Sequence, residues 1–351
     1  MKVMMANYPW IGGIADYIEK AFIDHGCEVQ QYFYNEKKQV IHRYLKLNQV
    51  KYLDRKYVEK RRQIYNEKLK STAKQIKPDV FFVFNEGYVN TETIRVIRKT
   101  YKTKTICFIG DDPFDSYRFQ QLPYSLKYID HIYIGEKCWI DKIHRIAPES
   151  KLYKMLVGYD SSQFNFERSE LCRKTKIKRL DCTISFTGES YSKRAEGGYR
   201  SGILANLLKY DLKIWGDAGW RHQFQFYPDL QAAYQGERLS YDELLYVYAN
   251  TLINMNMPSP QLITAFQPRV FEIAACGGFQ IVDFREDLLE VFRDDEIVTF
   301  RTVPELKEKI EYFIKYPEKR KPYIEAGLRA VKGNTWHDRA AQIIANLKDE
   351  K

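Results

Sequence analysis

The sequence predicts an α/β protein with two doubly wound parallel sheets. Three observations lead to this class. The chain has 351 residues, which is more than one ordinary hydrophobic core holds, so two domains are expected. Short apolar runs of strand length alternate with helical stretches, which is typical of parallel sheets with crossover helices. The alternation stops once, near residue 166, and then begins again.

The first half of the chain contains six strand signals with helical or loop stretches between most of them. They lie at 2–6, 29–33, 77–84, 104–113, 130–137 and 151–158, and the fourth ends in an acidic turn. We expect residues 1–165 to form an N-terminal domain.

A long basic helical stretch at 41–76 interrupts this first domain. One side keeps an apolar stripe, and lysine and arginine supply much of the rest. The stripe is Val58, Tyr65, Leu69, Thr72 and Ile76, and the basic set includes Arg55, Lys56, Lys60, Arg61, Arg62 and Lys68. The stretch is either a solvated helix face or a surface for acidic lipid or an anionic acceptor.

The second half of the chain repeats the pattern after a polar, basic stretch at 166–181, which we expect to connect the domains. Strand signals follow at 182–188, 212–220, 252–257 and 279–282. Ser240 and Glu243 form a capping-box pattern that predicts the start of a helix. These segments belong to an expected C-terminal domain over 182–333.

Composition and charge limit the class of protein. Hydrophobic residues make up 44% and charged residues 29%, which is a globular composition. We expect a cytoplasmic protein because no signal-peptide core or membrane-length apolar run is present. The six cysteines form no CxxC pair and the histidines show no metal spacing, so neither a disulfide framework nor zinc is expected. The net charge of +10 suits nucleotides, phosphorylated acceptors, acidic membrane or nucleic acid.

Two turns of the first domain fall where strands end, which is where such sheets bind ligands. Gly12 and Gly13 form a strand-to-helix turn that is either a phosphate contact or a plain tight turn. Asp111 and Asp112 follow the fourth strand. This acidic pair would supply a general base, an anchor for an acceptor hydroxyl or a metal ligand, and a helix-capping turn is the alternative.

The second domain places glycines and cations in corresponding turns. Gly188 follows the first strand of this domain, and Lys193, Arg194 and Arg200 come soon after. Fixed cations beside a glycine loop suit a diphosphate, and a solvated basic loop is the alternative. Gly216 follows the next strand in the same way.

An acidic residue stands in the first turn of an otherwise apolar helix in "PRVFEIAACGGFQIVDF". The helix ends at Gly277 and Gly278, and a strand follows. Arg269 and Glu272 are three residues apart and share one face of this helix. They either pair with each other, or Glu272 accepts hydrogen bonds from two adjacent sugar hydroxyls.

About 75 residues around this motif resemble the C-terminal domain of CgeB-type, spore-protein-like glycosyltransferases, which are related to the retaining GT-B enzymes. The matching features are "RVFE", the glycine stop, the "DDE" turn, "PEL", "YPEKRKPYIEAG" and the terminal "W-x-x-R" helix. Weaker similarity extends to "SFTGESYSKR", "LKIWGDAGW" and "IGDDPFD". The resemblance implies a GT-B fold, in which two Rossmann-like domains face each other across a cleft.

The resemblance also implies roles for individual residues. Glu272 would bind the nucleotide ribose, and Lys193 and Arg194 would bind the diphosphate. The last helix, within 334–351, would cross back to the N-terminal domain. Retaining relatives often carry two glutamates with seven residues between them; the second matches Glu272, and the first falls on Thr264. This departure leaves the donor sugar and the stereochemical outcome open.

The expected reaction is transfer of a hexose-like sugar from a nucleotide-diphosphate donor to a hydroxyl of a glycan, lipid-linked or protein acceptor. A UDP-sugar is the first expectation, with GDP- and dTDP-sugars as alternatives, and no metal or other cofactor is expected. Lys193, Arg194 and the amides at Gly12 and Gly13 would stabilise the leaving group. A retaining outcome is expected; if the reaction inverts, Asp111 or Asp112 would be the base.

Two other classes of protein remain open at this stage. One is a degenerate member that binds a nucleotide sugar or glycan without turnover. The other is a nucleic-acid-binding protein, suggested by the net charge, although the sequence contains no recognisable reading motif. The basic stretch at 41–76 also suggests peripheral contact with the inner face of an acidic membrane.

Overall fold

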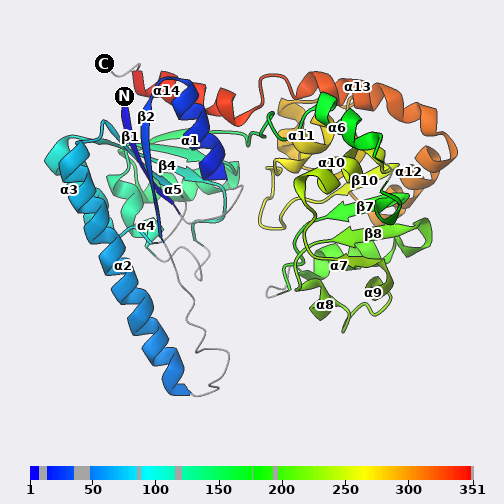
Figure 1. Cartoon of the computed structure of the whole chain (residues 1–351), viewed down its shortest axis with the longest axis horizontal. Coiled ribbons are helices and arrows are strands. Elements are labelled where there is room, and N and C mark those ends of the chain that lie inside the picture. The colour runs from blue at the N-terminus through cyan, green and yellow to red at the C-terminus, as the bar shows by residue number, and fades with distance from the viewer. Residues whose placement is uncertain are drawn as a thin grey trace. The chain divides into compact units, whose positions relative to one another are not determined.

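The computed structural model describes residues 1–7, 14–34, 48–84, 88–114, 121–175, 177–192 and 197–348, with the backbone alone at 48–57 (Figure 1). The chain divides into two compact units. Unit 1 comprises Met1–Leu156 and Arg339–Lys351, and unit 2 is Val157–Asp338. None of the helices in these described segments is long and apolar enough to cross a bilayer.

Unit 1 is built on a six-stranded parallel sheet. Its strands are β1 (Lys2–Asn7), β2 (Glu28–Phe33), β3 (Val80–Phe84), β4 (Lys104–Ile109), β5 (His131–Ile134) and β6 (Lys151–Lys154). The spatial order is β2-β1-β3-β4-β5-β6, and every pair is parallel. The six predicted strands are therefore confirmed. Strand order reverses between β1 and β3, and the chain that follows each of these two strands lies outside the described residues.

The helices of unit 1 alternate with these strands. They include α1 (Ile14–Asp24), α2 (Asn48–Ile76), α3 (Thr91–Tyr101), α4 (Leu122–Ser125) and α5 (Ile140–Ile146). Helix α2 confirms the basic helix predicted within 41–76. Tyr65, Leu69 and Thr72 of its predicted stripe are buried, and its outer surface carries ion pairs from Arg62 to Glu59 and from Lys70 to Glu67.

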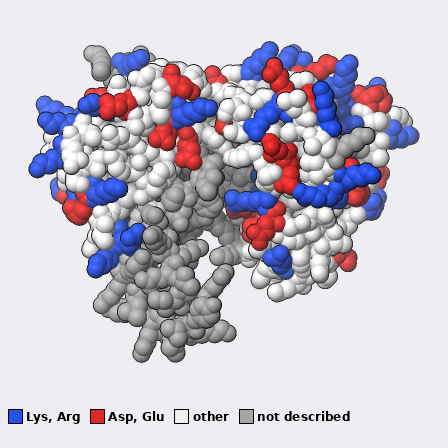
Figure 2. All heavy atoms as spheres, in the orientation of Figure 1, with Lys and Arg blue, Asp and Glu red and all other residues white. Residues whose placement is uncertain are grey.

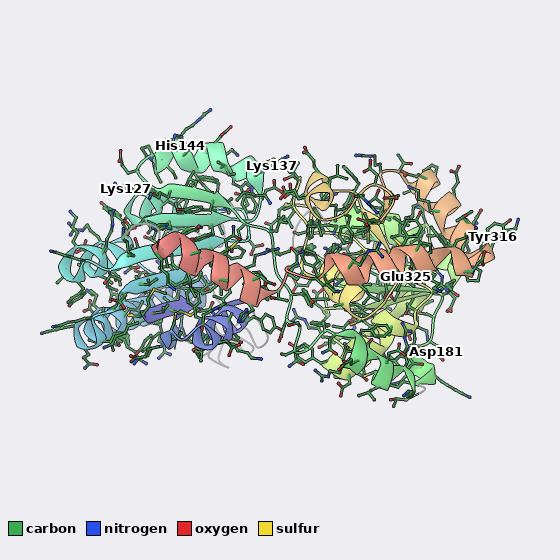
Figure 3. The ribbon with its side chains drawn as sticks, turned by 90° about the horizontal axis from the view of Figure 1, so that it is seen from above. Lys127, Lys137, His144, Asp181, Tyr316 and Glu325 are labelled. Carbon is green, nitrogen blue, oxygen red and sulfur yellow. The ribbon has the colours of Figure 1, made fainter. Side chains whose placement is uncertain are left out.

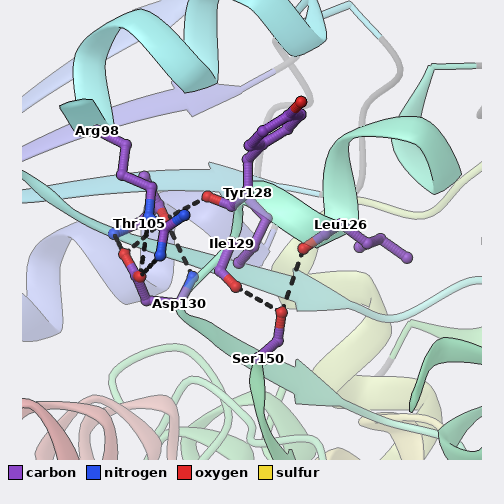
Figure 4. A network of polar contacts seen from close by, with 7 residues as sticks. All are labelled: Arg98, Thr105, Leu126, Tyr128, Ile129, Asp130 and Ser150. Carbon is purple, nitrogen blue, oxygen red and sulfur yellow. Dashed lines mark hydrogen bonds and ion pairs between the residues drawn. The ribbon is translucent and has the colours of Figure 1, made fainter. Parts of the chain in front are cut away.

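The amino-terminal edge of this sheet is held by a polar network (Figure 4). The Arg98 guanidinium contacts Asp130 Oδ1 at 2.6 Å, and the backbone N–H of Thr105 donates to Asp130 Oδ2 at 2.8 Å. Ser150 Oγ donates to the carbonyl of Ile129 at 2.7 Å. These contacts join the starts of β4, β5 and β6, at the edge opposite to the one where parallel sheets bind ligands. The Asp130 carboxylate therefore has a structural role.

Unit 2 is a second six-stranded parallel sheet. Its strands are β7 (Ile184–Thr187), β8 (Leu212–Trp215), β9 (Tyr234–Gly236), β10 (Ile253–Asn256), β11 (Gln280–Asp283) and β12 (Val298–Phe300). Their order is β12-β11-β10-β7-β8-β9. The four predicted strands are confirmed. The edge strands β9 and β12 were not predicted, because three residues each are too few to give a periodic signal.

Helices cover the faces of this second sheet. They include α7 (Gly197–Ala205), α8 (Trp220–Gln223), α9 (Leu230–Ala233), α10 (Tyr241–Asn250), α11 (Arg269–Ala275), α12 (Val303–Lys315) and α13 (Lys321–Ala330). The predicted capping box is confirmed at the start of α10, where Ser240 accepts from the Glu243 backbone and Glu243 bonds back to Ser240. With parallel sheets and flanking helices in both units, the protein has the predicted α/β fold with two Rossmann-like units.

The structure differs from expectation at 166–181, which we expected to connect the domains. Phe166–Arg173 forms helix α6, with Asn165 accepting a hydrogen bond from the Arg168 backbone at its N-cap. Helix α6 packs against α10. Ser169 Oγ also donates to the carbonyl of Cys276 at 2.9 Å. Because α6 exposes the apolar side chains of Phe166 and Leu171 and buries the polar Ser169, its sequence lacks the amphipathic signal that would have predicted it.

Helix α14 (Trp336–Lys348) begins in unit 2, and from Arg339 onward it belongs to unit 1. Arg339 Nε donates to the carbonyl of Leu156 at 2.9 Å, and Asn346 Nδ2 donates to the Tyr133 hydroxyl at 3.3 Å. Ala340 and Ile343 are fully buried. Figure 3 shows the helix lying over the strands of unit 1.

We expect Ile343→Val to lower the free energy of unfolding of unit 1 by about 1 kcal/mol, because it removes one buried methylene group. Hydrogen exchange of the β4 and β5 amides measures this change. The control is Gln342→Ala, an exposed neighbour on the same helix, which should leave that exchange unchanged. Equal effects of the two substitutions would contradict the packing of α14 on unit 1.

Candidate functional site

The candidate site lies in unit 2, where the strand order reverses. The chain runs from β7 outward to β8 and β9, and then returns to place β10 on the other side of β7. In such sheets the loops that follow the two strands at the reversal diverge and leave a crevice for a ligand. Here these loops begin at Gly188 after β7 and at Met257 after β10.

Arg200 on α7 joins these two loops. Its Nη1 donates to the carbonyl of Glu189 and its Nη2 to the carbonyl of Met257, each at 2.7 Å. The side chain lies over the Tyr191 ring, 4.5 Å from its centroid, and the residue is only 1% exposed. Burial lowers the pKa of Arg200 to about 10, so the guanidinium remains charged at neutral pH. The alternative of a solvated basic loop is therefore wrong for Arg200, which is buried and holds the backbone around the crevice.

Gly188 and Gly216 lie side by side although 28 positions separate them in the sequence. A Cβ atom on Gly216 would be 2.0 Å from the carbonyl oxygen of Gly188. Trp220 Nε1 donates to that same carbonyl at 2.9 Å. The structure thus brings these two predicted site residues together. The close approach of the two backbones is the physical reason for glycine at position 216.

Asp217 also connects the loops that follow β7 and β8. Asp217 Oδ1 accepts a hydrogen bond from the Ser190 backbone at 2.6 Å, and Asp217 Oδ2 accepts one from the Gly219 backbone at 3.1 Å. Ser190 Oγ donates to Oδ2 at 3.1 Å. These bonds set the course of the loop that runs toward Lys193 and Arg194, which themselves lie outside the described residues.

Tyr248 connects Arg269 and Glu272. Arg269 Nε donates to the Tyr248 hydroxyl oxygen at 3.2 Å, and both Arg269 and Tyr248 lower the pKa of the Glu272 carboxyl. The hydroxyl also lies 3.3 Å from Thr187 Oγ1, at the end of β7. A tyrosine hydroxyl is both a donor and an acceptor, so it can accept from the guanidinium while donating to the carboxylate. The Tyr248 network, as we call Thr187, Tyr248, Arg269 and Glu272, therefore stands beside the crevice.

The environment of Glu272 raises the pKa of its carboxyl group. Burial raises the pKa of the Glu272 carboxyl above its usual value, and Arg269 and the Tyr248 hydrogen bond lower it without cancelling the rise. The residue keeps partial exposure, so the carboxylate stays within reach of a ligand. Glu272 lies in the first turn of α11, as predicted.

The loop that carries Thr264 is held by the residues that follow β11. Asp287 donates its backbone N–H to the Thr264 carbonyl at 2.9 Å, and Arg285 Nε donates to the Leu262 carbonyl at 3.0 Å. Arg285 is paired with Asp283 at 3.0 Å. Thr264 itself is 7% exposed. The position that carries an acid in retaining relatives therefore lies in a well-anchored loop.

The predicted residues of the first domain lie in unit 1. Asp111 and Asp112 follow β4, and Asp112 Oδ1 accepts from the Phe114 backbone at 2.9 Å. This bond gives Asp112 a turn-forming role, and both aspartates remain candidates for the predicted roles. Gly12 and Gly13 lie outside the described residues. Among the side chains that the structure describes, no three His, Cys, Asp or Glu residues form a group that would hold a metal.

Tyr248 is a site residue that the sequence reasoning missed. It lies in a predicted helix among several apolar and aromatic residues, and nothing in its spacing separates it from core tyrosines. Its only sequence signal is its place in the last turn of a helix that leads into β10, and this signal is common in α/β proteins.

We expect Tyr248→Phe to raise the pKa of Glu272 further, because the hydrogen bond that lowers it is lost. The free energy of unfolding should fall by about 1 kcal/mol. Carbon-detected NMR titration of Glu272 and chemical denaturation measure the two effects. The control is Tyr246→Phe on the same helix, which loses its 2.6 Å bond to Asp181 and should leave the Glu272 titration unchanged. An unchanged Glu272 pKa in Tyr248→Phe would contradict the network.

The two parallel sheets with their flanking helices have the arrangement of α/β folds of the GT-B type. Residues 200–345, which is less than half of the chain, match the model of a family described as glycosyl transferase-like. This match includes α7, α10, α11 and the whole Tyr248 network apart from Thr187. No curated protein matches the sequence.

Solved structures share this fold along the whole chain. The sucrose-phosphate synthase from Thermosynechococcus elongatus has a TM-score of 0.70 and 11% identity, covering 99% of this chain and 98% of its own. The Anabaena protein HepE in complex with UDP-glucose has a TM-score of 0.66 and 12% identity, covering 100% of both chains. A UDP-forming trehalose-phosphate synthase from Burkholderia xenovorans has a TM-score of 0.67 and 12% identity, covering 99% and 98%. At these identities the likeness shows a common GT-B fold.

Proposed function

We propose that this protein is a glycosyltransferase that moves a sugar from a nucleotide-diphosphate donor to a hydroxyl acceptor. The observation that carries the proposal is the Tyr248 network beside the β7–β10 crevice, within a stretch that matches a glycosyl transferase-like family. The Glu272 carboxylate, with Arg269 and Tyr248 nearby, would offer two acceptor oxygens to the two hydroxyls of a ribose. This role for Glu272 is the one that the resemblance to CgeB-type enzymes implies.

A UDP-sugar is the donor that we propose, with a hexose as the transferred group. The HepE structure holds UDP-glucose, and the trehalose-phosphate synthase is named as UDP-forming. Gly188, where the chain leaves β7, would let the ligand approach the backbone at the crevice. Arg200 holds the loops after β7 and β10 in place, so that the site is preorganised before the donor arrives.

The chemistry that we propose places negative charge on the departing diphosphate. Lys193 and Arg194 would stabilise that charge, which would make the reaction independent of a metal. In a retaining reaction the departing phosphate would take the proton of the acceptor hydroxyl. In an inverting reaction Asp111 or Asp112 would be the base. The acceptor would be bound by unit 1, and α2 would contact an acidic membrane if that acceptor is lipid-linked.

A thermal-shift panel of UDP-, GDP-, dTDP- and CMP-sugars tests the donor. A ligand that binds only the folded state raises the melting temperature by mass action, and we expect the UDP-sugars to do so. Release of UDP from UDP-glucose, lost in Glu272→Ala, would then establish turnover. If none of the four donor classes shifts the melting temperature, the proposed function is wrong.

Thr264 favours a second candidate, a protein that binds the nucleotide sugar without turning it over. Retaining relatives carry an acid at this position, and here a buried threonine replaces it. The two candidates separate in the same experiment. Binding of a UDP-sugar without release of UDP, in the presence of a broad acceptor mixture, would support the second.

A further inference from the structure

A pocket of about 310 Å³ lies in unit 2, away from the crevice. It is lined partly by Asn250 and Thr251, which come just before β10, and by Gly277, which comes just before β11. The pocket therefore stands at the amino-terminal edge of the sheet, opposite to the loops that follow β7 and β10. Helix α13 and the short turn η7 (Pro317–Arg320) form its other side; Tyr316 and Glu325 mark this region in Figure 3.

Three cations line this pocket, and none of its lining residues is acidic. They are Arg173 from α6, Arg320 from η7 and Lys321 from the first turn of α13. Figure 2 shows that basic side chains are frequent on the part of unit 2 where α6 and α13 lie. The nearest acidic partners belong to the rim, where Glu170 pairs with Arg173 at 2.9 Å and Glu325 lies 3.8 Å from Lys321.

The two arginines are held in place by the backbone. Arg173 Nη2 donates to the carbonyl of Gly277 at 3.2 Å, and Arg320 Nη1 donates to the carbonyl of Leu252 at 2.8 Å. Arg173 Nε is buried and has no hydrogen-bond partner among the described residues. A buried N–H group without a hydrogen-bond acceptor destabilises the folded protein, and a bound ligand could supply that acceptor. The planar guanidinium group matches the oxygens of a phosphate group.

We propose that this pocket binds a small phosphorylated ligand at a site separate from the donor crevice. The three cations would bind the phosphate oxygens, and Phe279 and Ile324 supply an apolar wall for the rest of the molecule. The volume is within the range of pockets that hold small molecules.

The pocket and the Tyr248 network share two helices but no residue. Helix α10 carries Tyr248, and its last residues Ala249 and Asn250 line the pocket. Helix α11 carries Glu272 and leads directly to Gly277. A phosphorylated ligand in the pocket would therefore bind at the C-terminal ends of the helices that hold the proposed ribose contact.

Titration of the full chain with inorganic pyrophosphate, with UDP present in excess, tests this site. We expect pyrophosphate to raise the melting temperature, and Arg173→Gln and Lys321→Glu each to weaken its binding at least about tenfold. The matched control is Lys332→Glu, an exposed lysine beyond the far end of α13, which should bind pyrophosphate as the natural protein does.

Lys321→Glu decides the test if Arg173→Gln folds poorly, because the Lys321 side chain is 80% exposed and its replacement leaves the core untouched. Circular dichroism confirms that each variant is folded. Pyrophosphate binding that is equal in the natural protein and Lys321→Glu would overturn the proposal, as would the absence of any binding. The comparison of variants holds whether or not UDP occupies the crevice, so it does not depend on the proposed donor.

Discussion

Replacing Glu272 by glutamine is expected to weaken the binding of UDP-glucose about 10- to 100-fold, because the charged acceptor for the ribose hydroxyls is lost. Glutamine keeps the size of the side chain and one carbonyl oxygen, so the crevice keeps its shape. Isothermal titration calorimetry measures the change. The control is Glu308→Gln, which replaces an exposed glutamate on α12 and should not alter the affinity. Unchanged affinity in Glu272→Gln would exclude the ribose contact.

Glu272→Gln should weaken donor binding, but it should keep or raise the thermal stability of the protein. The pKa of Glu272 is raised in the folded protein, so folding favours its protonated form. This contribution to stability is fully present below the pKa of the unfolded chain and is lost as the pH rises through the folded value. At neutral pH an ionised Glu272 therefore costs stability, and Glu272→Gln should unfold at the same temperature as the natural protein or higher.

The affinity for the donor should also depend on pH. A protonated carboxyl is a poorer acceptor for two hydroxyls, so UDP-glucose should bind more weakly as the pH falls through the raised pKa of Glu272. The loss should begin at a higher pH than an ordinary glutamate would give. Titration calorimetry over a pH series, with Glu272→Gln as the reference that lacks this group, measures the effect. An identical pH dependence in both proteins would contradict it.

The second large effect is expected for Gly216→Ala, which should lower the free energy of unfolding of unit 2 by about 3 kcal/mol. The new methyl group would lie 2.0 Å from the Gly188 carbonyl oxygen and 2.5 Å from Trp220 Nε1. The loops after β7 and β8 would have to separate, which would break the bond from Trp220 to Gly188. Donor binding should weaken as well, because these loops border the crevice.

Gly198→Ala is the matched control for this substitution. Gly198 lies in α7 of the same unit, and a Cβ atom there meets nothing within 4 Å. Alanine is the better helix former, so the variant should be as stable as the natural protein or slightly more stable. Chemical denaturation of both variants, followed by tryptophan fluorescence, compares them. Similar losses of unfolding free energy in Gly216→Ala and Gly198→Ala would show that the contact between Gly188 and Gly216 does not cause the destabilisation.

The fold could be predicted from the sequence because its strands are buried and apolar. Residues 80–84 and 104–109 read as short hydrophobic runs, and the capping box at Ser240 marks a helix start without any tertiary information. Strands β9 and β12 escaped prediction because edge strands of three residues carry no period. Helix α6 was not predicted, because its stability as a helix depends on its packing against α10.

The site could be predicted only in part. The sequence predicted Gly188, Gly216 and Glu272 as site residues. Glycines at the ends of strands and an acidic residue in an apolar helix are both easy to recognise. The sequence could not show that the backbones of Gly188 and Gly216 are in contact, because that contact depends on the pairing of β7 with β8. For the same reason the sequence could not show that Arg200 is buried between two loops. A basic residue after a glycine loop looks solvated until the structure places two backbone carbonyls against it.

The division of α14 between the two units has a consequence for how the protein is made. Unit 2 is one continuous stretch nested within unit 1, so helix α14 is synthesised after every residue of unit 2 that precedes it. Unit 1 can therefore bury Ala340 and Ile343 only once unit 2 has been made. Until then the incomplete unit 1 presents an uncovered apolar surface, which favours aggregation of the nascent chain.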